Sequence, residues 1–312
     1  MKNQNIHPKN IAEAAKIIKS GNLCAFPTET VYGLGADATN ASAVISIYKT
    51  KNRPRFNPLI VHCADLKMAQ ELVEFSSLAK KLTQFWPGSL TLVLPKKPNI
   101  PIADIVSAGL NTLGVRIPAH PLAQDLIKAV GKPLAAPSAN PSGLLSPTNA
   151  KMVKTAFNEK LPTLDGGVCT KGLESTILTI INNEIIQLRA GALSREIIEK
   201  TINQTVKIAA KNSDISAPGM LKSHYAPKAT LRLNITNPKE NEAYLAFGKI
   251  PIFKGKTKNL SPTGNLEEAA KNLFSYLNEL DTEKTIAIAP IPNTGLGEAI
   301  NDRLKRASTP KT

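Results

Sequence analysis

Residues 26–37 read Phe26-Pro27-Thr28-Glu29-Thr30-Val31-Tyr32-Gly33-Leu34-Gly35-Ala36-Asp37, and the interpretation of the whole chain starts from them. The apolar run 23–26 predicts a buried strand, and Pro27 predicts its end, because proline cannot donate to a sheet ladder. Hydroxyl side chains just beyond a strand are typical of a ligand-binding loop in an α/β sheet. An ordinary turn between a strand and a helix fits equally well, so other stretches must decide.

Length and composition restrict the class of protein. The chain has 312 residues, of which 42% are hydrophobic, which is enough for one large domain or two smaller ones. No apolar run approaches the roughly 18 residues of a membrane span, and residues 1–10 lack the apolar segment of a signal peptide. We therefore expect a cytoplasmic protein without a membrane segment. The three cysteines form no CxxC pair, so we expect buried thiols rather than a disulfide or a zinc site.

The net charge is strongly positive. Lys and Arg number 39 against 24 Asp and Glu, which gives +15. Such an excess favours a polyanionic partner, such as nucleic acid or a nucleotide. Many lysines are scattered along predicted helix faces, however, and a solvated basic surface explains most of the excess.

The order of predicted elements indicates two units. Helical and strand-like segments alternate along the first 200 residues, which predicts an α/β fold. A polar stretch with Pro218-Gly219 and no regular period follows, which is typical of an interdomain linker. We assign 1–204 to a first domain, 205–228 to the linker and 229–312 to a small C-terminal α/β domain. The apolar stripe of 266–280 predicts an amphipathic helix in this last domain.

A second informative stretch carries four cations within the seven residues 49–55. Proline favours extended backbone in the residue before it, so Pro54 and Pro58 predict an extended segment. In that conformation Lys51, Arg53 and Arg55 would share one face as a fork for phosphate oxygens. A solvated charged run is the alternative, although the segment leads directly into the apolar run 59–61.

Further polar side chains stand at predicted strand ends or in the loops after them. They are Thr28, Thr30, Asn57, His62, Arg116, Ser138, Asn140, Ser175 and Arg189. Together with the cations they predict a basic, hydroxyl-lined cavity for an anionic ligand. There is no GxxxxGK[ST] motif, and Gly33-x-Gly35 lacks the third glycine of a dinucleotide-binding fingerprint. We expect this glycine pair to let the chain turn.

Several longer motifs support a family resemblance. They are Pro27-Thr28-Glu29-Thr30-Val31-Tyr32-Gly33-Leu34-Gly35, Lys51-Asn52-Arg53-Pro54, Asn57-Pro58-Leu59-Ile60-Val61-His62, Phe85-Trp86-Pro87-Gly88, Ala136-Pro137-Ser138-Ala139-Asn140, Glu174-Ser175-Thr176, Pro218-Gly219-Met220, His224-Tyr225-Ala226-Pro227, Gly295-Leu296-Gly297 and Asn301-Asp302-Arg303-Leu304. On these motifs the chain resembles the YrdC-like family of threonylcarbamoyl-AMP synthases, in its two-domain form, over nearly its whole length. The resemblance implies a twisted, mixed, open sheet with helices around a large basic cavity, and a smaller Rossmann-like α/β domain.

The resemblance also implies an activity. The family joins L-threonine, bicarbonate (or CO2) and ATP into threonylcarbamoyl-adenylate and pyrophosphate, and a separate transferase passes the threonylcarbamoyl group to the adenosine beside the anticodon of certain tRNAs. Because this chemistry brings two anions together, it needs fixed cations where charge builds up. Mg²⁺ would accompany the ATP, and no residue of the chain is expected to ligate a metal.

Site residues follow from the same resemblance. Lys51 and Arg53 would be catalytic. The ATP contacts would come from Lys51, Arg53, Asn57, Ser138, Asn140, Ser146 and Arg189. The threonine contacts would come from Thr30, His62, Arg116 and Ser175, with Arg116 facing the carboxylate. The linker would close over the cavity with Tyr225 as its plug. We expect Lys51→Ala or Arg116→Ala to lose activity without unfolding, because both residues would line a cavity rather than a core.

The chain departs from the family pattern at a few positions. Asn52 replaces the more usual glycine between the two cations, Ala190 replaces a proline and Ala217 replaces a serine. None of these changes removes a proposed contact group. Two other functions stay open from the sequence: an RNA-binding module that uses the basic cavity, and a regulator that binds ATP without turnover. Weak direct binding of tRNA is also compatible with the charge, but aromatic residues for base stacking make up only 4%.

Overall fold

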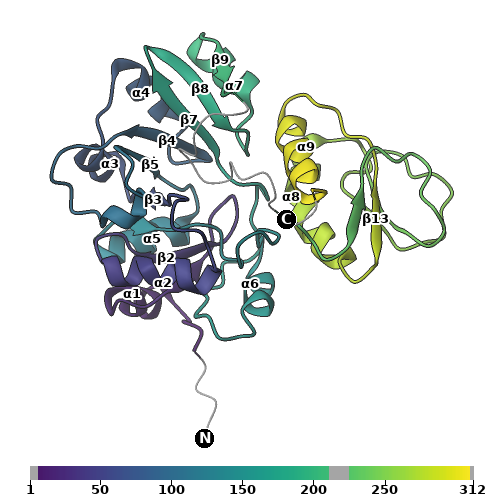
Figure 1. Ribbon diagram of the computed structural model, residues 1–312, viewed down its shortest axis with the longest axis horizontal. Helices are drawn as coiled ribbons and strands as arrows, with labels where there is room; N and C mark the ends of the chain where they lie inside the picture. The colour runs from purple at the N-terminus through teal and green to yellow at the C-terminus, as the bar shows by residue number, and fades with distance from the viewer. Residues whose placement is uncertain (1–5, 211–224, 310–312) are drawn as a thin grey trace, which may run out of the picture.

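The computed structural model describes residues 6–210 and 225–309. They form two units, each with its own sheet (Figure 1). In the first unit the strands are β1 (Cys24–Phe26), β2 (Gly33–Asp37), β3 (Ile60–His62), β4 (Leu90–Pro95), β5 (Thr112–Arg116), β6 (Leu134–Ala135), β7 (Thr176–Ile181), β8 (Glu184–Arg189) and β9 (Val206–Ile208). Its α-helices are α1 (Ile11–Lys19), α2 (Ala41–Lys51), α3 (Leu66–Leu72), α4 (Ser77–Leu82), α5 (Pro121–Val130), α6 (Ala150–Ala156) and α7 (Arg195–Ile202).

The sheet of the first unit is mixed and open. Its nine strands lie in the order β1-β2-β6-β3-β5-β4-β7-β8-β9. β3 pairs with β5, β4 with β7 and β8 with β9 in parallel, whereas the other neighbours are antiparallel. The helices α1, α2 and α5 gather near the β1–β2 end and α7 lies near the β8–β9 end (Figure 1). The predicted mixed α/β architecture is confirmed.

The glycines of the opening stretch have a different role from the predicted one. Gly33 and Gly35 lie inside β2, which pairs antiparallel with β1, so the connection is only 27–32. A Cβ atom on Gly35 would lie 2.8 Å from the ring of Phe26 and 3.2 Å from the carbonyl oxygen of Cys24. The expectation of a turn at these glycines was therefore wrong. Glycine is present because the Phe26 ring packs directly on the backbone of β2.

Replacing Gly35 by alanine is expected to destabilise the fold, since the added methyl group cannot fit without moving Phe26. Overpacking of this kind costs about 1–3 kcal/mol of unfolding free energy, measurable by denaturant titration. Gly114→Ala on β5 is the matched control, because a Cβ atom there would meet its nearest neighbour at an ordinary 3.6 Å. Equal stability of the two variants would show that the Phe26 contact does not constrain the sheet.

The cationic stretch also differs from the prediction. α2 continues to Lys51, and Asn52 ends it in the left-handed conformation with φ of 51°. Lys51 is therefore on the last helical turn, and Arg55 is exposed. The extended fork of three cations does not form, because helix α2 takes in the first of them. Asparagine and glycine are the two residues best suited to a left-handed helix end, which explains how Asn52 replaces a glycine.

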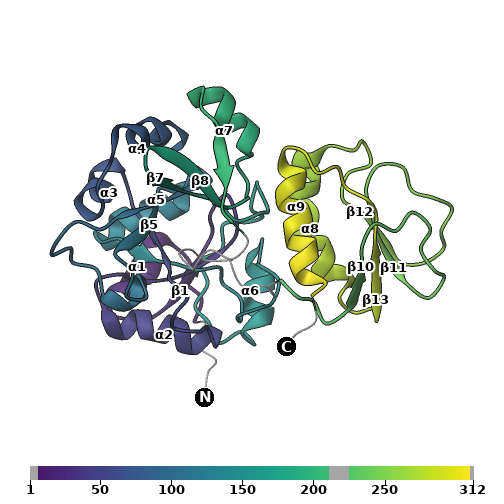
Figure 2. The ribbon, with the colours of Figure 1, turned by 45° about the horizontal axis from the view of Figure 1, so that its top comes forward.

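The second unit contains a parallel sheet. Its strands, in the order β10 (Thr230–Arg232), β13 (Thr285–Ile288), β11 (Ala243–Ala246) and β12 (Thr257–Asn259), are all parallel to their neighbours. The helices α8 (Leu266–Leu280) and α9 (Leu296–Ala307) lie between this sheet and the first unit (Figure 2). The predicted second α/β domain is confirmed, and its predicted helix 266–280 agrees with α8.

The connection between the units is described only in part. β9 pairs with β8, so the first sheet continues to Ile208, beyond the predicted boundary at 204. Residues 211–224, which hold most of the predicted linker, Ala217, Pro218-Gly219-Met220 and His224, lie outside the described residues. Tyr225 is described and packs against the second unit. Within 6–210 and 225–309, no helix is both long and apolar enough to cross a bilayer.

Candidate functional site

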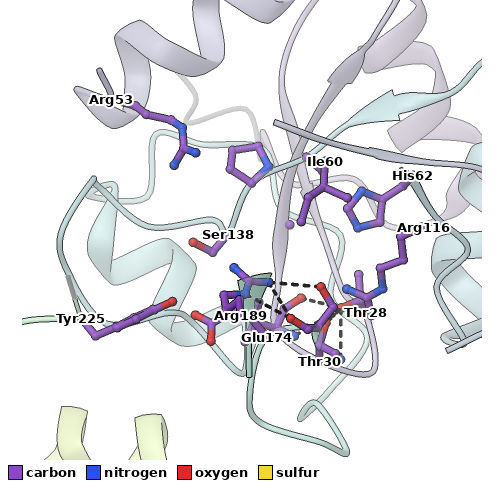
Figure 3. A pocket seen from close by; sticks show the side chains of 15 residues that line it. Thr28, Thr30, Arg53, Ile60, His62, Arg116, Ser138, Glu174, Arg189 and Tyr225 are labelled. Carbon is purple, nitrogen blue, oxygen red and sulfur yellow. Dashed lines mark hydrogen bonds between the residues drawn. The ribbon is translucent and has the colours of Figure 1, made fainter. Parts of the chain in front are cut away.

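A polar cavity opens where the ends of several strands of the first sheet meet. It holds about 560 Å³ of empty space, part of it open solvent. Its lining residues, drawn as sticks in Figure 3, are Thr28, Thr30, Val31, Gly33, Arg53, Ile60, His62, Arg116, Ala136, Pro137, Ser138, Glu174, Ser175, Arg189 and Tyr225. The three arginines make the cavity basic, as predicted.

The sheet topology explains why residues so distant in sequence meet here. His62 ends β3 and Arg116 ends β5, and these two residues are direct partners in the parallel register. Ser138 follows β6 and bridges to Gly33 at the start of β2. Arg189 ends β8. Ligand-binding side chains commonly gather just beyond the strand ends of α/β sheets, and this sheet follows that rule.

Two threonines of the opening stretch form one hydroxyl pair. The Oγ1 atoms of Thr28 and Thr30 are 2.7 Å apart, and Thr28 Oγ1 donates to the carbonyl oxygen of Val31 at 2.7 Å. Because Thr28 donates to that carbonyl, the shared bond must come from the Thr30 hydroxyl. The pair fixes the direction of both hydroxyls, so Thr30 is held in place on the cavity wall.

Arg116 is held by a buried carboxylate. Its Nη2 donates to Glu29 Oε1 at 2.6 Å and its Nε donates to the Gly88 carbonyl at 3.0 Å. Glu29 also accepts hydrogen bonds from Ser89 Oγ and the Ala119 amide. Burial alone would raise the pKa of Glu29, but the charge of Arg116 and the hydrogen bonds from Arg116 and the Ala119 amide lower it below its ordinary value. Arg116 thus lines the cavity and is also part of a buried ion pair.

His62 faces the cavity as a neutral imidazole. It is buried, and burial together with the charge of Arg116 lowers its pKa to about 3. Its Nδ1 has no hydrogen-bond partner among the described residues, and its ring meets the Phe26 ring edge-on at 6.1 Å. Buried polar atoms are normally satisfied by protein, water or ligand. A neutral imidazole can exchange a hydrogen bond with a polar ligand without adding charge.

Ser175 and Arg189 also line the cavity and are hydrogen-bonded to each other. Arg189 donates through Nε and Nη2 to the Ser175 carbonyl at 3.1 and 2.8 Å, and Nη2 is also 3.2 Å from Ser175 Oγ. The Ser175 hydroxyl lies 2.8 Å from Thr91 Oγ1 on β4. These bonds link β8 to the start of β7 and fix the guanidinium against the cavity.

Lys51 lies behind the cavity wall rather than on it. Only 2% of the residue is exposed, and its Nζ donates to the carbonyl oxygens of Ser138 and Asn140. Burial, and then the charge of Arg53, lower the pKa of Lys51 well below its ordinary value. The lysine therefore shapes the Ser-x-Asn loop, whose Ser138 side chain lines the cavity.

Arg53 and Asn57 complete this side. Arg53 lines the cavity and donates to the backbone carbonyls of Asn57 and Pro58, and burial lowers its pKa to about 10. Asn57 is 1% exposed, and within the described part of the chain neither the nitrogen nor the oxygen of its side-chain amide has a hydrogen-bond partner. The same holds for Asn140 Oδ1. Buried amides left in this state are suited to a ligand or water that reaches them.

Comparison with known proteins shows the family of this chain. A family model described as telomere recombination matches residues 16–191, and one described as threonylcarbamoyl-AMP synthase, C-terminal domain, matches residues 193–309. The threonylcarbamoyl-AMP synthase of Bacillus subtilis is 38% identical, over 96% of this chain and 92% of its own length. This chain belongs to the threonylcarbamoyl-AMP synthase family. The crystal structure of Pyrococcus abyssi Sua5 complexed with L-threonine superposes with a TM-score of 0.87 at 36% identity, over 96% of this chain and 94% of that one.

A shorter member of the family is also informative. The threonylcarbamoyl-AMP synthase of Klebsiella pneumoniae is 29% identical and aligns over 98% of its own length, but over only 59% of this chain. A protein of that length cannot contain both units described above. Members of the threonylcarbamoyl-AMP synthase family therefore occur with and without the second domain.

The predicted site residues of this synthase-family chain fall into two groups. Those that line the cavity are Thr30, Arg53, His62, Arg116, Ser138, Ser175, Arg189 and Tyr225. Those that lie outside the lining are Lys51, Asn57, Asn140 and Ser146. Ser146 is fully buried and donates to Glu174 Oε1 at 2.6 Å. Nothing in the described residues tests which ligand each of the twelve contacts, so those roles stay predictions.

Glu174 is a lining residue that the sequence assignment did not include. It stands next to Ser175 in the family motif, and its carboxylate bonds Ser146 on one side and Arg303 on the other, at 2.9 Å from Nε. Burial alone would raise the pKa of Glu174, but the charges of Arg303 and Arg189 and the two hydrogen bonds lower it to about 2. The motif Glu174-Ser175-Thr176 could have indicated this residue, but we did not expect an acidic side chain in a site for anions.

Glu174 should make the stability of this protein depend on pH in the acid range. Its pKa in the folded state is below the ordinary value of 4.5, so the unfolded chain binds the proton first and protonation favours unfolding. The stabilisation is complete above pH 4.5 and is lost as the pH falls toward 2. Denaturant titrations at several pH values in this range give the unfolding free energy as a function of pH, and this free energy should fall less steeply with decreasing pH for Glu174→Gln than for wild type. The control Glu71→Gln, at an exposed position, should show the same dependence on pH as wild type. The same dependence on pH in all three proteins would contradict the role assigned to Glu174.

Proposed function

We propose that the cavity joins L-threonine, bicarbonate and ATP into threonylcarbamoyl-adenylate and releases pyrophosphate. The observation that carries this proposal is the combination of side chains that line one cavity, in a chain that belongs to this family. The threonine and serine hydroxyls, a neutral histidine and Arg116 are suited to an amino acid. Arg53, Ser138 and Arg189 are suited to phosphate oxygens.

Charge balance explains why these side chains suit the reaction. The threonine nitrogen takes up the carbon of bicarbonate, with loss of water, to give a carbamate. A carbamate oxygen then attacks the α-phosphorus of ATP, and the bond to the β-phosphate oxygen breaks as pyrophosphate leaves. Two anions approach each other in this step, so we assign Arg53 and Arg189 to the nucleotide and Arg116 to the threonine carboxylate.

Positioning should dominate the catalysis. The two carboxylates near the cavity, Glu29 and Glu174, are each held by an arginine, and His62 stays neutral with a pKa of about 3. A general base free to take the amine proton is therefore not among the assigned groups. Side chains locked by buried hydrogen bonds are well suited to holding reactants in reactive geometry.

The described residues do not offer a protein cage for a metal. Among residues 6–210 and 225–309, no cluster of three or more His, Cys, Asp or Glu side chains is arranged to bind an ion. We propose that Mg²⁺ reaches the site on the phosphate oxygens of ATP, where it would neutralise part of their charge.

The product of this reaction requires a second enzyme that uses it. A mixed anhydride of a carbamate and AMP is reactive and labile in water, so a transferase that moves the threonylcarbamoyl group to tRNA must follow. Cytoplasmic action and weak direct binding of tRNA stay predictions. Closure of the linker over the cavity also stays a prediction, although the predicted plug Tyr225 lies on the cavity wall.

Release of pyrophosphate tests the proposal. Purified protein should release pyrophosphate from ATP only when both L-threonine and bicarbonate are present, and L-serine should replace threonine poorly. Release that is independent of threonine would contradict the proposal. Salt-sensitive RNA binding without any ATP turnover would favour the RNA-binding alternative instead.

A further inference from the structure

We propose that Arg303, on the second domain, is a positioning residue for the synthase cavity. Its guanidinium balances the negative charge of Glu174 and holds this carboxylate away from the nucleotide. The part of the cavity lined by Arg189 therefore stays favourable to phosphate oxygens. The inference rests on the proposed function, because it concerns how well that cavity binds ATP. It gives the second domain a role in the chemistry of the first.

The contacts of Arg303 are those of a fixed side chain. It is the largest fully buried side chain of the described residues, with 1% exposed. Its Nε donates to Glu174 Oε2 at 2.9 Å, Nη2 donates to the carbonyl of Ala190 at 2.8 Å, and Nη1 donates to Asp302 Oδ2 at 2.7 Å. Three separate directions of the guanidinium are thus used, and two of the acceptors belong to the first domain.

The ion pair between Arg303 and Glu174 affects the ligand because Glu174 is a carboxylate at the cavity. It lines the cavity, and its carboxylate lies beside the Arg189 side chain (Figure 3). A carboxylate in this place repels an anionic ligand and attracts the arginine that should meet the ligand. Arg303 and Ser146 hold its two oxygens separately, so the carboxylate is fixed and its charge is balanced from behind the wall.

The second domain also holds Tyr225, another residue that lines the cavity. The Tyr225 ring stacks on the ring of Phe274 in α8, with 5.5 Å between the ring centroids. The Arg303 guanidinium lies over the Tyr225 ring, with its Cζ 5.2 Å from the ring centroid. Tyr225 therefore lines the cavity while its ring packs against side chains of α8 and α9. One arginine of the second domain contacts two lining residues at once.

The two domains pack closely enough to keep this arrangement. A Cβ atom on Gly172, two residues before Glu174, would lie 2.4 Å from the carbonyl oxygen of Lys271 on α8. Leu173 shares an apolar cluster with Phe274 and other α8 and α9 side chains. Helix α8 thus contacts the backbone next to Glu174 directly, and the position of α9 is coupled to the cavity wall.

Four variants of the full chain test the proposal: Arg303→Met, Arg303→Lys, the double variant Arg303→Met/Glu174→Gln, and Lys305→Met as a control at an exposed position of the same helix. Initial rates of threonine-dependent pyrophosphate release give KM for ATP and for threonine. Binding of a non-hydrolysable ATP analogue, followed by calorimetry, gives a readout that does not need turnover. Wild type that binds the analogue but releases no pyrophosphate would refute the proposed reaction and leave the role of Arg303 measurable.

We expect Arg303→Met to raise KM for ATP by roughly tenfold or more, and KM for threonine much less, because threonine carries no net charge. The double variant should recover most of the ATP affinity, because it lacks the unbalanced carboxylate. Arg303→Lys should lie between, since it keeps the charge but not the three-way contact. Lys305→Met should match wild type.

Two results would overturn the proposal. One is ATP affinity in Arg303→Met that equals wild type. The other is a double variant that binds ATP no better than Arg303→Met, since a purely structural role predicts no rescue by Glu174→Gln. If Arg303→Met does not fold, the comparison of the double variant with Arg303→Lys decides. The proposal requires the double variant to bind ATP at least as well.

Discussion

Lys51→Met is expected to lower kcat/KM for ATP by roughly a hundredfold or more while the protein stays folded. The buried ammonium bonds the carbonyls of Ser138 and Asn140, so its loss releases the loop that presents Ser138 to the cavity. Loss of hydrogen bonds to a charged donor costs about 1.5–3 kcal/mol each. Burying the cation also costs several kcal/mol, so the two effects largely offset each other in stability.

The assay is threonine-dependent pyrophosphate release, with thermal unfolding measured in parallel. Lys49→Met is the matched control, because Lys49 is exposed on the same last helical turn. It should keep wild-type activity. Wild-type activity in Lys51→Met would show that the loop holds its shape without the lysine. Complete unfolding would show that Lys51 is chiefly a structural residue.

Arg116→Met is expected to abolish threonine-dependent turnover and also to destabilise the protein. The sequence alone predicted loss of activity without unfolding, and the structure corrects this because Arg116 forms a buried ion pair with Glu29. Removing one partner leaves the other charge buried and unbalanced, which costs about 3–5 kcal/mol. Denaturant titration measures this cost.

A double variant separates the two effects of Arg116. Arg116→Met/Glu29→Gln removes both charges, so it should regain most of the unfolding free energy lost in the single variant. It should still bind threonine poorly, because the cation for the carboxylate is absent. Recovery of threonine binding in the double variant would contradict the assignment of Arg116 to the substrate.

Much of the fold could be predicted where hydrophobic pattern and burial agree. The stripe of α8 appears in the sequence because one helical face is buried against the sheet and α9, and the predicted helix 266–280 matches it. The role of Gly35 could not be predicted, because the reason for glycine is the Phe26 ring across the β1–β2 pair. β9 and β12 are short and lack a fully buried face, so they show no clear strand pattern.

The site was predictable as a set of residue types and less so as a geometry. Polar side chains at strand ends indicated the cavity, since strand ends meet at one edge of the sheet. The place of Lys51 behind the wall depends on how far α2 extends. The pair of Glu174 and Arg303 joins residues 129 positions apart in different domains, and no local pattern reports such a contact.

Direct detection of the product tests the central claim. The protein is incubated with ATP, labelled bicarbonate and labelled L-threonine, and the mixture is analysed at once by mass spectrometry. The claim predicts an adenylate that carries both labels, formed together with pyrophosphate, and formed much more slowly when Lys51 is replaced by methionine. ATP consumed without a doubly labelled adenylate would contradict it.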